Sequence, residues 1–217
     1  RIMILIFDLM DTIIDDPFYA NFFNKLNKEQ KKYWLRIKNH EAYILFEEGK
    51  ILENEYVNQS YKEDPREYQL PSVLKMKKMM FRQIHYLPGI EELFEKIHQC
   101  KKELNIYTIL ASNYSQWYHE IFFKKKELND WFDYIFFSCE MGIRKPDERF
   151  YRVIYESLPD VFNDQEVVLF FDDKKENLSA LQHLNWEGVW IYDKNQSSKI
   201  IYHAIEKKCP HFVNAGK

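Results

Sequence analysis

One stretch near the start of the sequence decides the fold: residues 2–8 read IMILIFD, six apolar residues in a row that end at Asp8. A run that is apolar at every position, and not only at alternate ones, is typical of a strand buried on both faces of a parallel sheet. The run is far too short to cross a membrane. We therefore predict a central strand here, with the Asp8 carboxylate at its carboxyl end.

Four more apolar runs occur along the chain, and small or charged residues follow each of them. They cover residues 106–110, 134–137, 167–171 and 189–192. Between the strands, apolar residues recur at helical spacing over residues 91–97, 148–158 and 176–184. Strands that alternate with helices indicate an α/β fold. We expect a three-layer, Rossmann-like sandwich with a parallel sheet in the middle.

Residues 17–86 have a different pattern. This segment is rich in Lys and Glu, its aromatic residues recur at helical spacing, and it contains no convincing strand run. We expect an all-helical cap domain over residues 17–86, inserted into an α/β core domain that comprises residues 1–16 and 87–217.

The composition narrows the kinds of molecule that the protein is expected to bind and the cellular compartment in which it is expected to work. The 217 residues are 46% hydrophobic and carry a net charge of −3, so the chain lacks the basic excess of a dedicated nucleic-acid-binding protein. The three cysteines, Cys100, Cys139 and Cys209, are odd in number and far apart, which favours a reducing compartment. We expect a cytoplasmic protein that acts on a small molecule and binds neither nucleic acid nor membrane.

Polar residues follow the predicted strands where ligands bind in open parallel sheets, beyond the carboxyl ends. They are Asp8, Ser112, Asn113, Lys145, Asp172 and Asp173. The set combines a carboxylate nucleophile, hydroxyl and amide donors, a cation, and an acidic pair suited to a hard metal ion.

Each of these groups has a role in phosphoryl transfer. A carboxylate such as Asp8 can attack phosphorus and divide one difficult displacement into two easier ones. Mg²⁺ shared by Asp8 and Asp172 would relieve the repulsion between nucleophile and substrate. Lys145 would stabilise the negative charge of the transition state and restrain Asp8, and the Ser112 hydroxyl would donate to a phosphoryl oxygen.

Four segments resemble, in order and spacing, the motifs of the haloacid dehalogenase-like hydrolase superfamily. They are residues 4–12 (ILIFDLMDT), 110–113 (LASN), 142–147 (GIRKPD) and 169–177 (LFFDDKKEN). The resemblance covers nearly the whole chain, and the helical insertion stands where the superfamily has its first type of cap. The double-Asp form of the fourth segment, with Asn177 after it, is similar to the branch that contains sugar-phosphate phosphatases and the amino-terminal domain of epoxide hydrolases.

The resemblance implies a reaction and a set of site residues. The reaction is hydrolysis of a small phosphomonoester, such as a sugar phosphate or another phosphorylated metabolite, through an aspartyl-phosphate intermediate. The implied catalytic residues are Asp8, Lys145 and Ser112, and the implied substrate-binding residues are Ser112, Asn113 and Lys145. The implied ligands of Mg²⁺ are Asp8, the backbone carbonyl of Met10, Asp172 and Asp173.

One position departs from the superfamily's pattern. Its phosphatases usually have a second Asp two residues after the nucleophile as general acid and base, whereas this chain has Met10. Asp11 comes next, but neighbouring residues of an extended segment point to opposite sides, so Asp11 does not obviously replace the acid. General acid–base help is typically worth about 10²–10⁴ in rate. We expect a slow phosphatase, or one that uses substrates with good leaving groups.

The sequence leaves two other functions open. Carbon–halogen cleavage in this superfamily uses the same nucleophile without the second Asp, although it needs no Mg²⁺, so the pair Asp172 and Asp173 argues against it. A catalytically silent relative that binds a phosphorylated ligand or a protein partner would explain Met10. Retention of Asp8 and Lys145 argues against that second alternative.

Simpler roles are also open for some residues. Asp173 could be only the N-cap of a helix that begins at Lys174, and Asn177 could hold its loop without touching a ligand. Four residues that follow the first motif are further candidates for substrate contacts: Asp15, Asp16, Phe18 and Tyr19.

Overall fold

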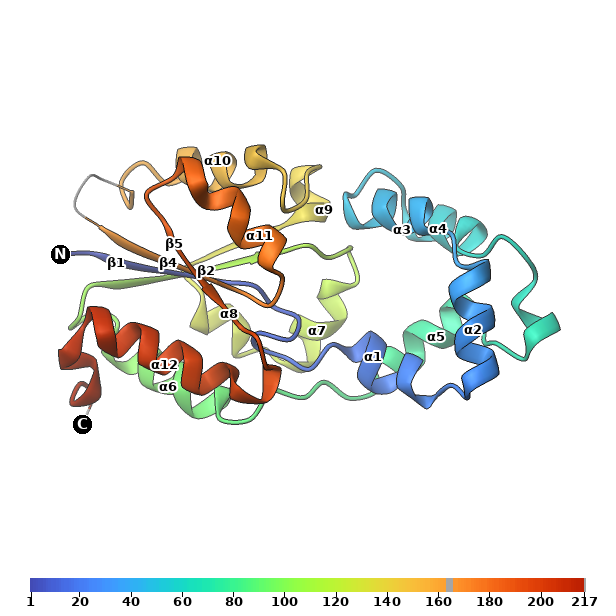
Figure 1. Ribbon diagram of the computed structural model, residues 1–217, viewed down its shortest axis with the longest axis horizontal. Helices are drawn as coiled ribbons and strands as arrows, with labels where there is room; N and C mark the ends of the chain where they lie inside the picture. The colour runs from blue at the N-terminus through green and yellow to red at the C-terminus, as the bar shows by residue number, and fades with distance from the viewer. Residues whose placement is uncertain (163–165, 217) are drawn as a thin grey trace.

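The computed structural model describes residues 1–162 and 166–216 and contains a five-stranded sheet in which all neighbouring strands are parallel. The strand order is β3-β2-β1-β4-β5 (Figure 1). The strands are β1 (Met3–Phe7), β2 (Ile106–Ser112), β3 (Tyr134–Phe137), β4 (Val167–Asp172) and β5 (Glu187–Trp190). The strand order reverses at β1, because β2 and β3 lie on one side of it and β4 and β5 on the other. The predicted α/β fold is confirmed.

Helices cover both faces of this sheet. Below it in the view of Figure 1 lie α6 (Ile90–Cys100) and α12 (Ser197–Lys208), which pack against each other. Above it lie α10 (Glu148–Ser157) and α11 (Lys175–Ser179). The three layers follow from the helices that connect the parallel strands, because each connection must cross over one face of the sheet.

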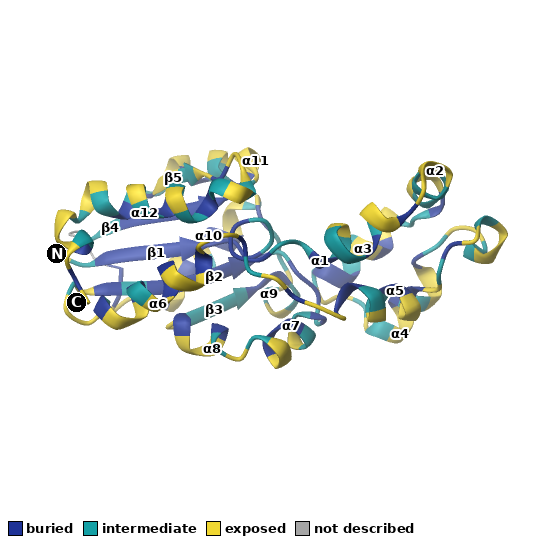
Figure 2. Ribbon diagram, turned by 90° about the horizontal axis from the view of Figure 1, so that it is seen from below, coloured by how far each residue is buried: buried dark blue, intermediate teal, exposed yellow. Residues whose placement is uncertain are grey.

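The central strand β1 has a buried side chain at all five of its positions (Figure 2). Met3, Leu5 and Phe7 belong to the core on the α6 and α12 side, whereas Ile4 and Ile6 belong to the core on the α10 side. Successive side chains of a strand point to opposite faces. Burial on both faces therefore explains why the run is apolar at every position.

Short helices complete the described part of the chain, and none of its helices is both long and apolar enough to cross a membrane. Near the sheet these are α7 (Tyr118–Lys124), α8 (Leu128–Trp131) and α9 (Ser138–Met141). The 3-10 segments are η1 (Phe23–Lys25), η2 (Pro65–Tyr68), η3 (Ala180–His183), η4 (Lys194–Gln196) and η5 (Pro210–Val213).

Residues 17–86, the helical insertion, contain five α-helices and no strand. They are α1 (Pro17–Asn21), α2 (Lys28–Ile37), α3 (His40–Glu47), α4 (Glu53–Gln59) and α5 (Val73–Met80). The helices lie beyond the carboxyl ends of the strands, apart from the sheet (Figures 1 and 2). The Trp34 ring centroid lies 5.0, 6.3 and 5.5 Å from those of Phe18, Phe22 and Phe23. The limits of a separate cap domain stay a prediction.

The turn after α3 brings the helical insertion into close contact with the α/β part. Gly49 has φ of +71°, and a Cβ atom added to it would lie 2.0 Å from the Cys139 carbonyl oxygen in α9. The Ser138 hydroxyl donates a hydrogen bond of 2.6 Å to the Glu47 carbonyl oxygen. Glycine is needed here both for the left-handed backbone and for the close approach of two backbones.

Two elements differ in their bounds from the sequence prediction. The apolar run at 189–192 predicts the last strand two residues too late, because pairing with β4 begins at Glu187. The helix predicted over 176–184 ends at Ser179 and continues as the 3-10 segment η3, the tighter geometry that often closes an α-helix.

The contact at Gly49 predicts a difference between two glycine substitutions. Gly49→Ala and Gly142→Ala both place Ala at a positive φ, which costs about 1–2 kcal/mol. Only Gly49→Ala also forces a methyl group into a backbone carbonyl, since no atom lies within 4 Å of the Cβ position at Gly142. Urea denaturation should therefore show a larger loss of unfolding free energy for Gly49→Ala. Equal losses would mean that the close contact with Cys139 is absent in solution.

Candidate active site

The centre of the site is formed by the carboxyl ends of two paired strands. Asp8 follows β1 directly, and Asp172 is the last residue of β4. The two strands pair in register, with Phe7 opposite Phe171, and the Asp8 amide donates a 2.9 Å hydrogen bond to the Phe171 carbonyl. Parallel pairing in this register places the two carboxylates next to each other.

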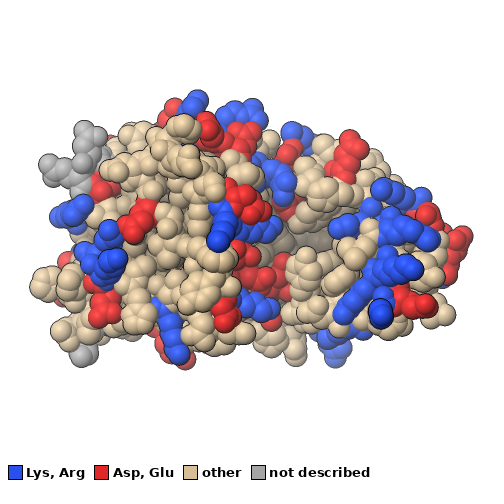
Figure 3. Space-filling model, viewed as in Figure 1, with Lys and Arg blue, Asp and Glu red and all other residues tan. Residues whose placement is uncertain are grey.

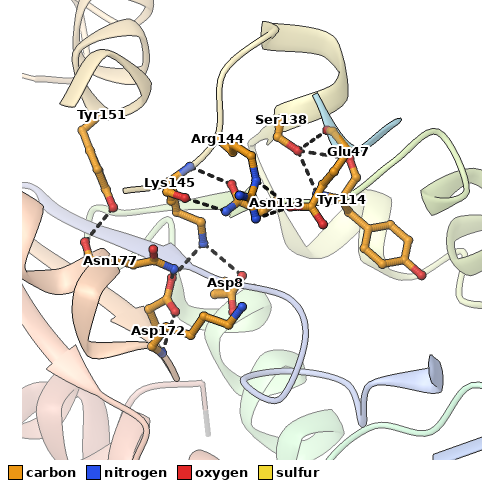
Figure 4. A network of polar contacts seen from close by, with 11 residues as sticks. Asp8, Glu47, Asn113, Tyr114, Ser138, Arg144, Lys145, Tyr151, Asp172 and Asn177 are labelled. Atoms are coloured by element: carbon orange, nitrogen blue, oxygen red, sulfur yellow. Dashed lines mark hydrogen bonds and ion pairs between the residues drawn. The ribbon is translucent and has the colours of Figure 1, made fainter. Parts of the chain in front are cut away.

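Lys145 lies between these two carboxylates. Its Nζ atom is 3.0 Å from Asp8 Oδ1 and 2.7 Å from Asp172 Oδ2 (Figure 4). The Lys145, Asp8 and Asp172 side chains are only 1%, 10% and 0% exposed. Charges buried to this extent are costly unless they are paired and hydrogen-bonded, so the position of Lys145 is a requirement of the fold as well as of any reaction.

Asn113 fixes the backbone of Lys145. The Asn113 Oδ1 atom accepts a 2.8 Å hydrogen bond from the Lys145 amide, and Asn113 Nδ2 donates one of 2.9 Å to the Lys145 carbonyl. One side chain thus holds both backbone polar groups of a residue that is 32 positions away. The structure gives Asn113 this positioning role, while its predicted contact with substrate stays a prediction.

The residues after β4 hold Asp172 from the other side. Asp172 Oδ1 accepts a 2.9 Å hydrogen bond from the Lys174 amide, and Asp172 Oδ2 accepts one of 3.0 Å from Asn177 Nδ2. The Tyr151 hydroxyl donates to the Asn177 carbonyl at 2.6 Å. Asn177 therefore holds the loop. The alternative of Asp173 as a helix N-cap is wrong, because α11 begins at Lys175 with Lys174 in the cap position.

Three carboxylates crowd together at this point. One oxygen from each of Asp8, Asp172 and Asp173 lies within 4.8 Å of the others. Burial, and then the charge of Asp172, raises the pKa of Asp8; burial, and then Asp8, raises the pKa of Asp173. Burial would lower the pKa of Lys145, but Asp172 and Asp8 outweigh it and raise this pKa. One cation faces three carboxyl groups, and their oxygens are the donors that hard divalent cations prefer.

The other predicted site residues lie around this centre. Ser112 is the last residue of β2, is fully buried, and its hydroxyl has no hydrogen-bond partner in the described part of the chain. It is not among the residues that line the cavity described below, whereas its neighbour Asn113 is. Met10 lines the cavity described below. Asp11 has φ of +56°, and its Oδ1 atom accepts a 3.1 Å hydrogen bond from the Asp16 amide. Asp11 is thus engaged in shaping the loop after β1.

A cavity of about 730 Å³ opens from the carboxylates toward the helical insertion. Figure 3 shows the surface hollowed between the two parts, with acidic side chains gathered on the core side. Aromatic side chains of the insertion that line the cavity include Phe18, Tyr19, Phe23, Trp34, Tyr43 and Tyr61. The cavity is acidic at one end and largely aromatic at the other.

The structure separates the four candidates that follow the first motif. Asp16, Phe18 and Tyr19 line the cavity. Asp15 is not among the lining residues, and its Oδ1 atom lies 2.7 Å from Lys194 Nζ.

An ion pair between Glu47 and Arg144 lies beside the site and is not predicted from the sequence. Glu47 Oε1 lies 2.8 Å from a terminal nitrogen of Arg144, the residue before Lys145, and the Glu47 side chain is 3% exposed. The pair joins the helical insertion to the loop that carries Lys145. No feature of the sequence distinguishes Glu47 from its neighbour Glu48, because the two partners are 97 residues apart.

The buried group around Lys145 predicts a pH-dependent loss of stability. Lys145→Met keeps the apolar length but leaves Asp8 and Asp172 buried without their cation, which should cost about 3–5 kcal/mol at pH 8. The pKa of Asp8 would rise further, so the folded state would hold protons that the unfolded state releases. Stability would then increase as the pH falls, and the loss would be smaller at pH 5.

Urea denaturation at both pH values, with a chelator present, measures this loss. Lys174→Met is the matched control, since Lys174 lines the same cavity without bridging Asp8 and Asp172. A loss that is equal at pH 5 and pH 8 would contradict its assignment to uncompensated carboxylates.

The known proteins that are similar to this chain include one relative by sequence and two solved structures. Flavin mononucleotide hydrolase 1 of Arabidopsis thaliana is 29% identical over 202 residues, which are 92% of this chain and 76% of that protein. A predicted HAD-like family hydrolase from Porphyromonas gingivalis has a TM-score of 0.63 at 18% identity, over 94% of this chain and 98% of that one. A HAD family enzyme from Bacteroides thetaiotaomicron, solved with magnesium and inorganic phosphate, has a TM-score of 0.60 at 17% identity, over 88% and 94%.

The two solved structures support the fold. The family to which the chain belongs is shown by a separate comparison with protein families. The sequence pattern of the haloacid dehalogenase-like hydrolase family matches residues 5–190, from within β1 to the last residue of β5. All the predicted site residues fall inside this match. The chain belongs to the haloacid dehalogenase-like hydrolases.

Proposed function

We propose that this chain is a Mg²⁺-dependent phosphatase that hydrolyses a small phosphomonoester through a covalent intermediate on Asp8. The observation that carries the proposal is the buried group of Asp8, Lys145 and Asp172 at the acidic end of a cavity. A nucleophilic carboxylate fixed by a cation, and open to a cavity large enough for a metabolite, has the parts that acyl-phosphate formation needs.

In the first step, an Asp8 carboxylate oxygen attacks phosphorus and the bond from phosphorus to the ester oxygen breaks. In the second step, water attacks the phosphorus of the aspartyl-phosphate and releases inorganic phosphate. Lys145 holds Asp8 in one orientation through its 3.0 Å hydrogen bond and places a positive charge where the transition state spreads negative charge. Asn113 supports both functions, because it fixes the Lys145 backbone.

The Ser112 hydroxyl fits a role in binding the phosphoryl group. It is fully buried without a partner among the described residues, and such an unsatisfied group costs about 1–3 kcal/mol. A phosphoryl oxygen would accept its hydrogen bond and remove that penalty. The substrate would thus satisfy a polar atom that no described residue satisfies.

The three clustered carboxylates fit Mg²⁺. Asp8, Asp172 and Asp173, with the Met10 backbone carbonyl, would hold the ion, which would neutralise the repulsion between Asp8 and a negatively charged phosphoryl group. The raised pKa values of Asp8 and Asp173 support this, because their burial together is unfavourable without more positive charge than Lys145 supplies. The related Bacteroides enzyme was solved with magnesium and phosphate.

We also infer that the helical insertion is a cap of the first type, and that the pair Asp172 and Asp173 places the chain in the double-Asp branch. The insertion supplies one wall of the cavity, so its contact with the α/β part would exclude bulk water from the reacting groups. A cytoplasmic location stays a prediction.

The volume and the lining of the cavity also indicate a kind of substrate. Its volume of about 730 Å³ leaves room for a leaving group much larger than a phosphate, and its far wall is aromatic. Flat aromatic groups stack favourably on such walls. The Arabidopsis relative is named for the hydrolysis of flavin mononucleotide, a phosphomonoester with a flat ring system. We therefore propose flavin mononucleotide as the first substrate to test, with sugar phosphates as the smaller alternatives.

Phosphate release from a panel of phosphomonoesters should require Mg²⁺ and should be abolished in Asp8→Asn. This variant keeps the size of the side chain and removes the nucleophilic charge. Asp15→Asn is the matched control, because Asp15 is close in sequence but pairs with Lys194. Failure to hydrolyse any ester, together with tight binding of Mg²⁺ and phosphate, would favour a silent binding protein. Halide release from haloacids would favour a dehalogenase.

The aromatic wall predicts a selective effect of Tyr19→Ala. Tyr19 lines the cavity and is 47% exposed, so its loss should disturb the fold little. The loss of one stacking contact should raise KM for flavin mononucleotide about 3- to 10-fold and leave KM for glycerol phosphate unchanged. Phe123→Ala, at an aromatic residue that is 74% exposed and outside the cavity lining, is the control. A similar rise in KM for both esters would mean that the aromatic wall does not select the substrate.

A further inference from the structure

Met10 leaves the proposed phosphatase without an acid at the usual position. When the ester bond breaks, the electron pair of that bond stays on the leaving oxygen, and an alkoxide is a poor leaving group unless it receives a proton. Outside the three clustered carboxylates, the described lining of the cavity contains three more carboxyl groups: Asp11, Asp16 and Glu47. These three are the candidates if a carboxyl group of the cavity outside that cluster supplies the proton.

Two of these carboxyl groups are already engaged. Glu47 forms the buried ion pair with Arg144, so its carboxyl group is already paired with a cationic side chain. Asp11 accepts a hydrogen bond from the Asp16 amide, and its Oδ1 atom also lies 4.0 Å from Lys194 Nζ. Through these contacts, both groups already stabilise the structure around them.

Asp16 is different because, unlike Glu47 and Asp11, it has no cationic side chain beside its carboxyl group among the described residues. As the N-cap of α1, it accepts a 2.9 Å hydrogen bond from the Phe18 amide through Oδ1. In the described part of the chain no Lys or Arg nitrogen lies within 4.0 Å of its carboxyl oxygens, and Oδ2 accepts no hydrogen bond. A second oxygen is thus left for a ligand in the cavity.

The surroundings place Asp16 between the core and the helical insertion. The charged or titratable groups that act on it come from α1, α3, the ends of β2 and β4, and the loops beside them: Asp11, Asp15, Tyr19, Tyr43, Tyr114, Lys174 and Lys194. Burial, and then the charge of Asp11, raises the pKa of Asp16 to about 7. A carboxyl group in this state can both donate and accept a proton near neutral pH.

We propose that Asp16 is the general acid and base of this enzyme, and that it replaces the acid missing at Met10. This inference rests on the proposed phosphatase function. In the first step Asp16 gives its proton, directly or through one water molecule, to the leaving oxygen as the bond between phosphorus and oxygen breaks. In the second step the Asp16 carboxylate takes a proton from the water that attacks the aspartyl-phosphate, which restores the starting state.

Asp16→Asn tests this role with little effect on the fold, because Asn is as good an N-cap as Asp. The variant is compared on two aryl esters of similar shape, phenyl phosphate and p-nitrophenyl phosphate. The p-nitrophenolate ion is a much weaker base than phenolate and leaves without a proton. Asp16→Asn should therefore lower kcat/KM, which reports the steps up to departure of the leaving group, about 10²–10⁴-fold for phenyl phosphate and less than about 10-fold for p-nitrophenyl phosphate. Loss of the base in the second step would lower kcat for both esters.

The pH profile gives a second measurement that a structural role would not change. With phenyl phosphate, the kcat/KM of the wild-type protein should fall as the pH rises through about 7, because the acid form of Asp16 is lost. That fall should be absent in Asp16→Asn and present in Asp15→Asn, the control at the neighbouring residue paired with Lys194.

The outcomes separate this inference from the proposed function. An equal loss of kcat/KM for both esters in Asp16→Asn, or no loss for either, would overturn the role of Asp16 while the phosphatase function stands. If the wild-type protein hydrolyses neither ester nor any other member of the panel, the phosphatase function itself fails and the role of Asp16 fails with it.

Discussion

The ion pairs of Lys145 with Asp8 and Asp172 are the interaction on which the rest of this structure depends. Three side chains that are almost fully buried carry charge in the middle of an aromatic and aliphatic core. Such charges are tolerated only where each has a partner at short distance and good geometry. Parallel pairing of β1 with β4 sets the spacing of the two carboxylates, and the two hydrogen bonds of Asn113 set the position of the lysine. The pairing of the strands therefore also positions the side chains of the site.

The same arrangement leaves the site short of positive charge. A single lysine faces three carboxyl groups, and burial raises the pKa of both Asp8 and Asp173. A dianionic phosphoryl group would make the deficit larger, so substrate binding and cation binding have to support each other. The buried hydroxyl of Ser112 is likewise left without a hydrogen-bond partner among the described residues. Under the proposed function, a bound phosphoryl group would supply that partner.

Much of the fold and the chemical centre could be predicted from the sequence, because both leave local signals. Burial on both faces makes β1 apolar at every position, and Asp8, Ser112 and Asp172 stand at strand ends or directly after them. The walls of the cavity could not be predicted in this way. The pair of Glu47 with Arg144 and the contact of Gly49 with Cys139 join segments about 90 or more residues apart, and neither partner has a distinctive pattern of its own. Tertiary packing alone brings them together.

The location of Asp16 changes what the helical insertion does in the proposed mechanism. An acid two residues after the nucleophile would belong to the loop after β1 and would be in place whatever the position of the insertion. Asp16 instead caps α1, the first helix of the insertion, so its carboxyl group is positioned together with that helix. The contacts that hold the insertion against the core, at Glu47 and Gly49, would then also set the distance of the acid from Asp8. Departure of the leaving group would be coupled to closure of the cavity, and hydrolysis in an open state would be slow for want of a proton donor.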